Sequence, residues 1–212
     1  MIYQHIFWDW NGTLFNDAEA AFQAVNKMLS ARELPPITFE QYRDYVDVPI
    51  SRFYEKVMDM SKESMEDLSV EFHKYWSEYL KSAPLADDAY DLVKFLHEKG
   101  VKQYIFSSSQ KELILPYLEK YGIVDCFDAV LASDDCYVGS KAERTKKFFD
   151  SLGVNKFNVL FIGDMVHDSD VASLVDCDCI LLSCGHQSEK ALISSGREVL
   201  LSVKELSTLI KG

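Results

Sequence analysis

The sequence has little positive charge and no long apolar run. Among its 212 residues, 22 are Lys or Arg and 34 are Asp or Glu, which gives a formal net charge of −12. Nucleic acids and anionic membrane surfaces are bound by clustered cations, so this balance argues against both kinds of partner. The chain also lacks an apolar stretch of about 18 residues and a basic leader at its N-terminus. We therefore expect a cytoplasmic protein that does not cross a membrane.

Cysteines are few, and their positions follow no pairing pattern. There are five, an odd number, and they lie in or beside apolar stretches, which favours reduced, buried thiols over a disulfide framework. Cys177 and Cys179 have no second Cys or His pair at ligand spacing, which argues against a metal site of that kind. Internal repeats and low-complexity segments are absent as well. With 48% hydrophobic and 26% charged residues, the chain is typical of a globular protein with one sizeable core.

Apolar periodicity divides the chain into two kinds of segment. An apolar run ends at Trp8, and Asp17 can cap the helix that follows. Four helical patterns, the second from about Phe39 to Tyr45, extend to about residue 84 with no strand between them. Beyond Pro84, helical patterns alternate with strands, of which Val159–Ile162 is the clearest. Repeated strand–helix units predict an α/β fold, a Rossmann-like, doubly wound parallel sheet with helices on both faces.

The all-helical segment interrupts this sheet between its first and second strands. We expect residues 1–16 and 85–212 to form the α/β core and residues 17–84 to form a helical cap domain. An insertion directly after a strand that ends in a reactive residue lies above the carboxyl edge of the sheet, where it can cover a site. The cap is therefore predicted to face the residues at the strand ends.

Four predicted strands lead to residues suited to phosphate chemistry. Asp9 and Ser107 directly follow the first two strands, Lys141 comes from the loop after the third, and Asp164 follows the fourth. Ligands of an open α/β sheet bind outside the carboxyl ends of its strands, so these residues are expected to converge. Two carboxylates, a hydroxyl and an ammonium group favour a Mg²⁺ and phosphate site, because Mg²⁺ takes hard oxygen ligands and Lys neutralises phosphoryl charge.

These motifs resemble those of the haloacid dehalogenase-like hydrolases, and among them the phosphatases of the phosphoglycolate phosphatase type. Phe7–Thr13 is similar to the family's apolar residues followed by Asp-x-Asp-Gly-Thr, and Gly163–Asp168 matches Gly-Asp-x-x-x-Asp in full. Ser107 resembles the Ser or Thr of the second motif. Lys141 is the best match to the third, although Ala142 stands where a Pro often follows. The helical segment has the position of the family's cap.

The resemblance implies a nucleophile and a metal site. Asp9 would attack phosphorus and form an aspartyl-phosphate, which splits one difficult displacement into two easier ones. Asp9, Asp164 and the main-chain carbonyl of Asn11 would coordinate Mg²⁺ as cofactor. The substrate implied is a small phosphorylated metabolite, whose identity the sequence does not indicate. Nothing in the sequence indicates an oligomeric state.

The resemblance also implies a phosphate-binding set. Ser107, Ser108 and Lys141 would bind phosphoryl oxygens, and Asp168, in the second shell of the metal, would orient Lys141 or a metal-bound water. For Lys141 a different interpretation is open, since it begins a helix that also carries Arg144 and other cations and could lie on a solvated face. A phosphomutase, which uses similar phosphoryl chemistry, is a further alternative for the function.

Asn11 is the main departure from the family pattern. The family carries Asp there, and that Asp protonates the leaving oxygen and later activates water. An amide cannot exchange this proton, and general acid–base groups contribute about 10² to 10⁴ in rate. Three explanations stay open. The enzyme acts on phosphates with good leaving groups or uses a substrate or cap residue as the acid; it is a slow enzyme or a non-catalytic phosphate-binding protein; or Asn11, followed by Gly12, deamidates to an acid.

Two arginines, one histidine and one short segment are further candidates for positions near the site. Arg43 and Arg52 in the predicted cap are expected on the solvated surface, with a contact to a substrate carboxylate or second phosphate as the alternative. His167 lies inside the fourth motif and is expected at the rim of the site. Gly185–Gln187 follow a strand end and could line its edge.

Overall fold

A parallel sheet forms the centre of the molecule. The computed structural model describes residues 3–80, 83–133 and 141–211. The strand order is β3-β2-β1-β4-β5-β6, and every pairing is parallel. The strands are β1 (His5–Trp8), β2 (Lys102–Gln110), β3 (Ala129–Ser133), β4 (Val159–Gly163), β5 (Asp178–Leu182) and β6 (Glu198–Leu200). The order reverses at β1, so β1 and β4 flank the switch point at which open α/β sheets bind ligands.

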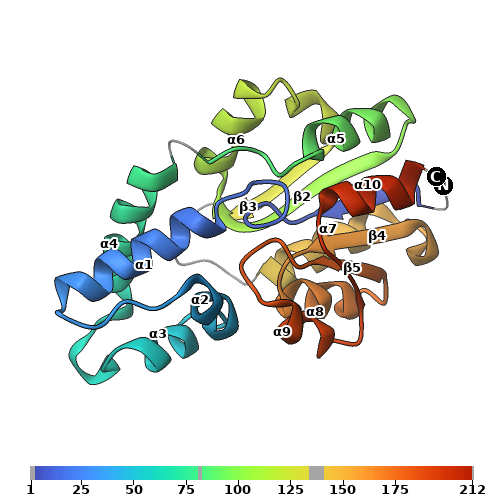
Figure 1. The fold of residues 1–212 in the computed structure, drawn as a ribbon. Coiled ribbons are helices and arrows are strands. Elements are labelled where there is room, and N and C mark those ends of the chain that lie inside the picture. Colours follow the sequence, from blue (N-terminus) through green and yellow to red (C-terminus); the bar gives the residue numbers. More distant parts are fainter. Residues whose placement is uncertain (1–2, 81–82, 134–140, 212) are drawn as a thin grey trace.

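Both faces of the sheet are covered by helices (Figure 1). Successive residues of a strand point to opposite faces: Ile6 and Trp8 belong to one apolar cluster and Phe7 to the other. The first cluster includes side chains of α5 (Ala89–Glu98), α6 (Lys111–Lys120) and α10 (Val203–Lys211). The second is covered by α7 (Lys141–Leu152), α8 (Val166–Leu174) and α9 (Glu189–Ile193). The predicted fold class, a Rossmann-like, doubly wound parallel sheet, is confirmed.

A group of helices separates β1 from β2 in the chain. They are α1 (Ala18–Ala31), α2 (Phe39–Tyr45), α3 (Ser51–Val57) and α4 (Met65–Tyr79). We call these helices and the loops between them the helical insertion; they lie together at one end of the molecule (Figure 1). Arg32, after α1, pairs with Glu63 and Glu71 at 2.7 Å each, and Thr38 and Gln41 form a capping box at the start of α2. Apolar side chains of the insertion continue the first cluster.

Two local features differ from the sequence expectation. The second strand does not end before the serines: β2 continues to Gln110, so Ser107–Ser109 are strand residues and α6 begins only at Lys111. Asp17 precedes α1 but its side chain does not cap that helix; it accepts hydrogen bonds from the turn after β1 instead. Within the described residues, no helix combines the length and the apolarity needed to cross a bilayer.

Candidate active site

Three buried carboxylates gather at the carboxyl end of the sheet. β1 and β4 pair in register, with Trp8 opposite Ile162, so the residues that follow them, Asp9 and Asp164, emerge side by side. Asp168, in the first turn of α8, completes the group. One carboxylate oxygen from each of the three lies within 4.8 Å of the others. None of the three residues is more than 5% exposed, so the cluster is a buried site rather than a solvated acidic patch.

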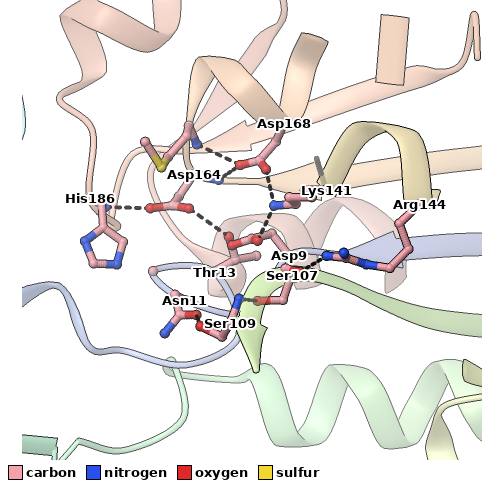
Figure 2. Close-up of polar contacts among 12 residues, drawn as sticks. Asp9, Asn11, Thr13, Ser107, Ser109, Lys141, Arg144, Asp164, Asp168 and His186 are labelled. Atoms are coloured by element: carbon pink, nitrogen blue, oxygen red, sulfur yellow. Dashed lines mark hydrogen bonds and ion pairs between the residues drawn. The ribbon is translucent and has the colours of Figure 1, made fainter. Parts of the chain in front are cut away.

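The main chain of two glycines lies so close to Asp164 that a side chain at either position would clash with its carboxylate. A Cβ on Gly12 or on Gly185 would come within 2.1 Å of Asp164 Oδ2. Gly12 also has a φ of +74°, a conformation that an L side chain rarely adopts. Asp164 Oδ2 accepts a hydrogen bond from the main-chain N–H of His186 at 2.5 Å, and Oδ1 accepts one from the Thr13 hydroxyl at 3.3 Å. The carboxylate is therefore oriented from two separate turns (Figure 2).

Lys141 projects from the start of α7 into the same cluster. Its ammonium group donates to Asp168 Oδ1 at 2.6 Å and also to Asp9 Oδ1 (Figure 2). Asp168 Oδ2 accepts from the main-chain N–H groups of Asp164 and Met165 at 3.0 and 2.9 Å. Because both oxygens of Asp168 are engaged in this way, its role in the cluster is to hold Lys141 and the start of α8. Lys141 is 7% exposed, so it does not lie on a solvated helix face.

The last residues of β2 form the neighbouring wall. Ser107 is buried, and its Oγ accepts a hydrogen bond from the N–H of Ser109 at 3.0 Å. Arg144 of α7 donates to the main-chain oxygen of Ser107 at 2.7 Å, which ties the strand end to that helix. Ser107, Ser108 and Ser109 all line the same cavity as Asp9. The extended β2 thus presents a short hydroxyl-bearing edge to the carboxylates.

Asn11 takes part in a hydrogen-bond network of its own. Its Nδ2 donates to Asp17 Oδ2 at 2.8 Å, and its Oδ1 accepts from the Ser109 hydroxyl at 2.5 Å. Asp17 Oδ1 accepts from the N–H of Gly12 at 2.8 Å and lies 3.3 Å from His186 Nε2. His186 Nδ1 is 2.8 Å from the hydroxyl of Tyr42 on α2. The network therefore runs from the turn after β1 to the helical insertion.

A cavity of about 420 Å³ lies over these residues. The rest of the chain contributes Asp9, Asn11, Asp17, Ser107, Ser108, Ser109, Lys141, Met165, His167, Asp168 and His186. The helical insertion contributes Ala21, Tyr42, Val46, Asp47, Val48, Ile50, Phe72, His73 and Trp76. Both parts of the chain therefore enclose the space in front of Asp9.

Arg43 and Arg52, the two arginines considered for substrate binding, do not line this cavity. Arg43 is half-buried, and its guanidinium donates to the main-chain oxygens of Ser183 and Gln187, the latter at 2.8 Å. The surface position expected for Arg43 is therefore wrong. Arg52 is exposed, as expected, and pairs with Asp47 at 3.3 Å.

The cluster shifts the ionisation of its members. Burial raises the pKa of Asp9 well above its usual value, while Lys141 acts in the opposite direction. Burial raises the pKa of Asp164 to about 6 against the opposing charge of His186. For Lys141 burial favours the neutral form, but Asp168 and Asp9 outweigh it and raise its pKa. Burial likewise opposes the charged form of His186, but Tyr42 and Asp17 raise its pKa well above the usual value.

The donor set fits a hard divalent cation. Asp9 Oδ2 accepts no hydrogen bond from the described residues, and Asp164 receives only one neutral donor on each oxygen. Burial raises the pKa of these carboxyl groups, but a bound cation replaces the lost solvation and lets them ionise. Sites made only of oxygen ligands suit Mg²⁺. The two glycines that approach Asp164 keep side chains away from it. The residues present therefore suit the metal that the sequence motifs imply.

Comparison with known proteins places the chain in a family. The model of the haloacid dehalogenase-like hydrolases matches residues 6–182. The chain belongs to this family. Two similar proteins are a phosphoglycolate phosphatase of Vibrio parahaemolyticus, 24% identical over 97% of this chain and 95% of that protein, and the pyrophosphatase PpaX of Halalkalibacterium halodurans, 25% identical over 77% of this chain and 75% of that protein. The expectation of a hydrolase of the phosphatase type is confirmed at this level.

Solved structures repeat the fold of this hydrolase along its whole length. A predicted phosphatase from Clostridium acetobutylicum superposes with a TM-score of 0.76 at 20% identity and covers 99% of both chains. A putative β-phosphoglucomutase from Bacteroides vulgatus superposes with a TM-score of 0.72 at 14% identity, over 99% of this chain and 88% of that one. These likenesses establish the fold of the hydrolase and not its substrate.

The structure brings together every site residue that the sequence singled out. Asp9, Asn11, Ser107, Ser108, Lys141 and Asp168 line one cavity, and Asp164 lies directly beneath it. The sequence did not predict a role for Asp17 or Tyr42, and gave His186 only a place at the edge. The aspartate before α1 looked like an ordinary helix cap. Tyr42 belongs to an aromatic pattern that is typical of a helix core.

Proposed function

We propose that this protein is a Mg²⁺-dependent phosphatase that hydrolyses a small phosphomonoester through a phosphoaspartate at Asp9. The observation that carries the proposal is the placement of Asp9: it is buried, it faces a cavity, and it is paired with Lys141 on one oxygen only. The second oxygen accepts no hydrogen bond from the described residues and is available to react. Asp9 thus combines a free lone pair with an adjacent fixed cation.

Asp9, Asp164 and the main-chain carbonyl of Asn11 would hold Mg²⁺. When bound, the ion supplies positive charge between the nucleophilic carboxylate and the phosphoryl group, which repel each other. Asp168 would act at one remove, since its oxygens are engaged by Lys141 and by main-chain N–H groups. The support for this assignment is the convergence of the acidic side chains and the glycine-lined space around Asp164.

The remaining chemistry is assigned to side chains of the chain itself. Asp9 forms a bond to phosphorus while the bond from phosphorus to the ester oxygen breaks and the alcohol leaves with the electron pair. Lys141 and the hydroxyls of Ser107 and Ser108 bind the phosphoryl oxygens, whose charge grows in the transition state. Water then attacks the phosphoaspartate, which releases inorganic phosphate and regenerates Asp9.

We further infer that residues 17–84 act as a cap over a core made of residues 1–16 and 85–212. Support comes from the cavity, one wall of which belongs to the helical insertion. Hydrogen bonds between the segment 183–188 and Tyr42, Arg43 and Val46 join the two parts beside the site. A cap in this position would exclude bulk water from the phosphoaspartate and select the alcohol.

Asn11 favours a second candidate, a phosphate-binding protein of low catalytic power. Both polar atoms of its amide are used, one toward Asp17 and one toward Ser109. A carboxylate at position 11 would face Asp17 at the same short distance, so the surroundings favour the amide over its deamidated form. Asn11 therefore holds the turn after β1 but cannot exchange a proton with the substrate. A phosphomutase would be limited by the same lack.

Turnover of a panel of phosphate esters tests the proposal. We expect wild-type protein to release phosphate with Mg²⁺ and to stop when a chelator removes the metal. Asp9→Asn should lower kcat by at least about 10⁴-fold, as loss of a covalent nucleophile does. Acid-quenched wild-type protein should carry phosphate on the peptide that contains Asp9. If wild type is inert while Asn11→Asp gains activity, the binding-protein alternative holds; full activity in Asp9→Asn would refute the mechanism.

A further inference from the structure

We propose that the substrate is an aryl phosphate, the phosphomonoester of an uncharged phenol-type alcohol. This inference rests on the proposed phosphatase function and names its substrate class. Three independent features support it: the apolar wall of the cavity, the pairing of the cations near it, and the amide at position 11. Each removes a different class of competing ester.

The wall contributed by the helical insertion is mostly apolar. Six of its nine members are Ala21, Val46, Val48, Ile50, Phe72 and Trp76, and the other three are Tyr42, Asp47 and His73. A second cavity of about 220 Å³ lies inside the insertion and shares Tyr42, Ile50, Phe72 and His73 with the first, so the two spaces adjoin. Aromatic groups bury large apolar areas and pack well against such side chains. A sugar or glycerol would leave its hydroxyls facing carbon atoms, at the cost of unmade hydrogen bonds.

The cavity offers no spare Lys or Arg for a second anionic group, and His186 is already paired with Asp17 at 3.3 Å. Among its described lining residues, Lys141 is the only Lys or Arg, and it is engaged by Asp9 and Asp168. Arg43 points to main-chain oxygens instead of the cavity, and Arg52 is paired with Asp47. A carboxylate or second phosphate on the substrate would be desolvated beside acidic side chains, which costs several kcal/mol by general estimates of charge burial. Phosphoglycolate and pyrophosphate are therefore poor fits.

The amide of Asn11 limits the leaving group. With no proton donor at that position, the ester oxygen must depart as an anion, and a phenolate is a far better leaving group than an alkoxide because phenols ionise near pH 10. Asp9 bonds to phosphorus, the bond to the phenolic oxygen breaks, and the oxygen keeps the electron pair until it takes a proton from water. Hydrolysis of phospho-Asp9 by a second water then yields inorganic phosphate. The ester type that fits the wall is thus also one whose leaving group can depart without an acid.

A substrate series tests the leaving-group argument. The probes are phenyl phosphate, phenyl phosphates with ring substituents that span leaving-group acidity, glycerol phosphate, 2-phosphoglycolate and pyrophosphate, each with Mg²⁺. For wild type we expect kcat/KM on phenyl phosphate to exceed that on the other three compounds by about 10²-fold or more, the lower range for a missing general acid. Within the aryl series, log(kcat/KM) should fall steeply as the leaving-group pKa rises, and Asn11→Asp should flatten that slope.

The outcomes separate this inference from the proposed function. Faster turnover of 2-phosphoglycolate or pyrophosphate than of phenyl phosphate overturns the inference while the phosphatase stands. A flat leaving-group dependence in wild type does the same. Absence of turnover with every ester, together with absence of phosphate on Asp9, refutes the phosphatase and the inference with it.

A matched pair of variants tests the wall. Ile50 borders both cavities and is 45% exposed; Val70 lies on α4, is 69% exposed and borders neither. Ile50→Arg should lower kcat/KM for phenyl phosphate by about 10-fold and raise it for 2-phosphoglycolate, because it adds a cation to an apolar wall. Val70→Arg should leave both values unchanged. Equal behaviour of the two variants, at matched thermal unfolding midpoints, overturns the inference.

Discussion

The two walls of the cavity differ in how their side chains are held. On the core wall, the charged side chains are held by ion pairs and hydrogen bonds: Lys141 joins Asp9 to Asp168, and Asp164 is oriented by two turns. On the insertion wall, side chains such as Ile50 and Phe72 meet the cavity through carbon atoms alone. In the proposed function, the bonded wall carries the chemistry common to phosphate esters. The insertion wall would discriminate between esters, and its composition can change without disturbing the carboxylates.

Removal of the central cation should damage the core wall most. Lys141→Met leaves Asp9 and Asp168 facing each other in a buried space, so we expect kcat to fall by about 10³-fold and the free energy of unfolding by about 3–5 kcal/mol. Urea unfolding and phosphate release measure the two effects. Lys146→Met, on the same helix, is the control: its pair with Asp150 is exposed, so a change of at most about 0.5 kcal/mol is expected.

The same variant has a predictable pH dependence in metal-free protein. Without Lys141, burial and the charges of Asp168 and Asp164 raise the pKa of Asp9 still further above its unfolded value of 3.8. A carboxyl group with a raised pKa binds its proton more tightly when folded, so its contribution to stability is complete below the unfolded pKa and is lost as pH rises through the folded one. The deficit of Lys141→Met relative to wild type should therefore grow from acidic toward neutral pH. A deficit that shrinks with rising pH would contradict this account.

Substitution of Gly12, whose main chain lies close to Asp164, should give a smaller effect that is selective for activation by Mg²⁺. Gly12 and Gly100 have nearly equal φ values, +74° and +76°, yet a Cβ on Gly12 would lie 2.1 Å from Asp164 Oδ2 while one on Gly100 meets nothing within 4 Å. Replacing either by Ala should cost about 1–2 kcal/mol in stability from the left-handed backbone. Only Gly12→Ala should also weaken activation by Mg²⁺, by about 10-fold or more. Similar Mg²⁺ titrations for both variants would show that the approach is unimportant.

Loss of the hydrogen bond that links the two walls should give the smallest change in activity. Tyr42→Phe removes the hydrogen bond to His186, a loss of about 1 kcal/mol, which corresponds to about a fivefold increase in KM at unchanged kcat. The control is Tyr45→Phe on the same helix, because the hydroxyl of Tyr45 makes no hydrogen bond to the described residues. Steady-state kinetics on phenyl phosphate compare the two. An unchanged KM in Tyr42→Phe would mean that the walls act independently.

The core wall could be predicted from the sequence because short-range rules determine it. A residue that follows a buried parallel strand lies at the carboxyl edge of the sheet, and this rule predicts the positions of Asp9 and Asp164. Resemblance to a family motif then singled out Lys141, whose preceding loop lies outside the described residues. The helices of the insertion were also predictable from their periodicity, and α2 spans Phe39–Tyr45 as expected. The α/β fold follows from the same patterns.

The insertion wall was not predictable, since its contacts are long-range. Tyr42 and His186 are 144 residues apart, and no local pattern marks them as partners. Asp17 satisfied the rule for a helix cap, yet its carboxylate accepts hydrogen bonds from Asn11 and Gly12 because the turn after β1 folds back over it. Arg43 looked like a surface residue until packing brought main-chain oxygens within its reach. Such features depend on how two finished substructures meet.

The segment 183–188 carries a consequence for recombination between relatives. Gln187 accepts from the N–H of Val166 at 2.7 Å and donates to the main-chain oxygen of Val46 at 2.8 Å, and Ser188 donates to the oxygen of Arg43 at 3.1 Å. The same segment supplies the N–H that orients Asp164. A chimera that received only a foreign helical insertion would lose these junctions and with them the orientation of a core carboxylate. Insertion and segment therefore form one exchangeable unit, although residues 80–182 lie between them.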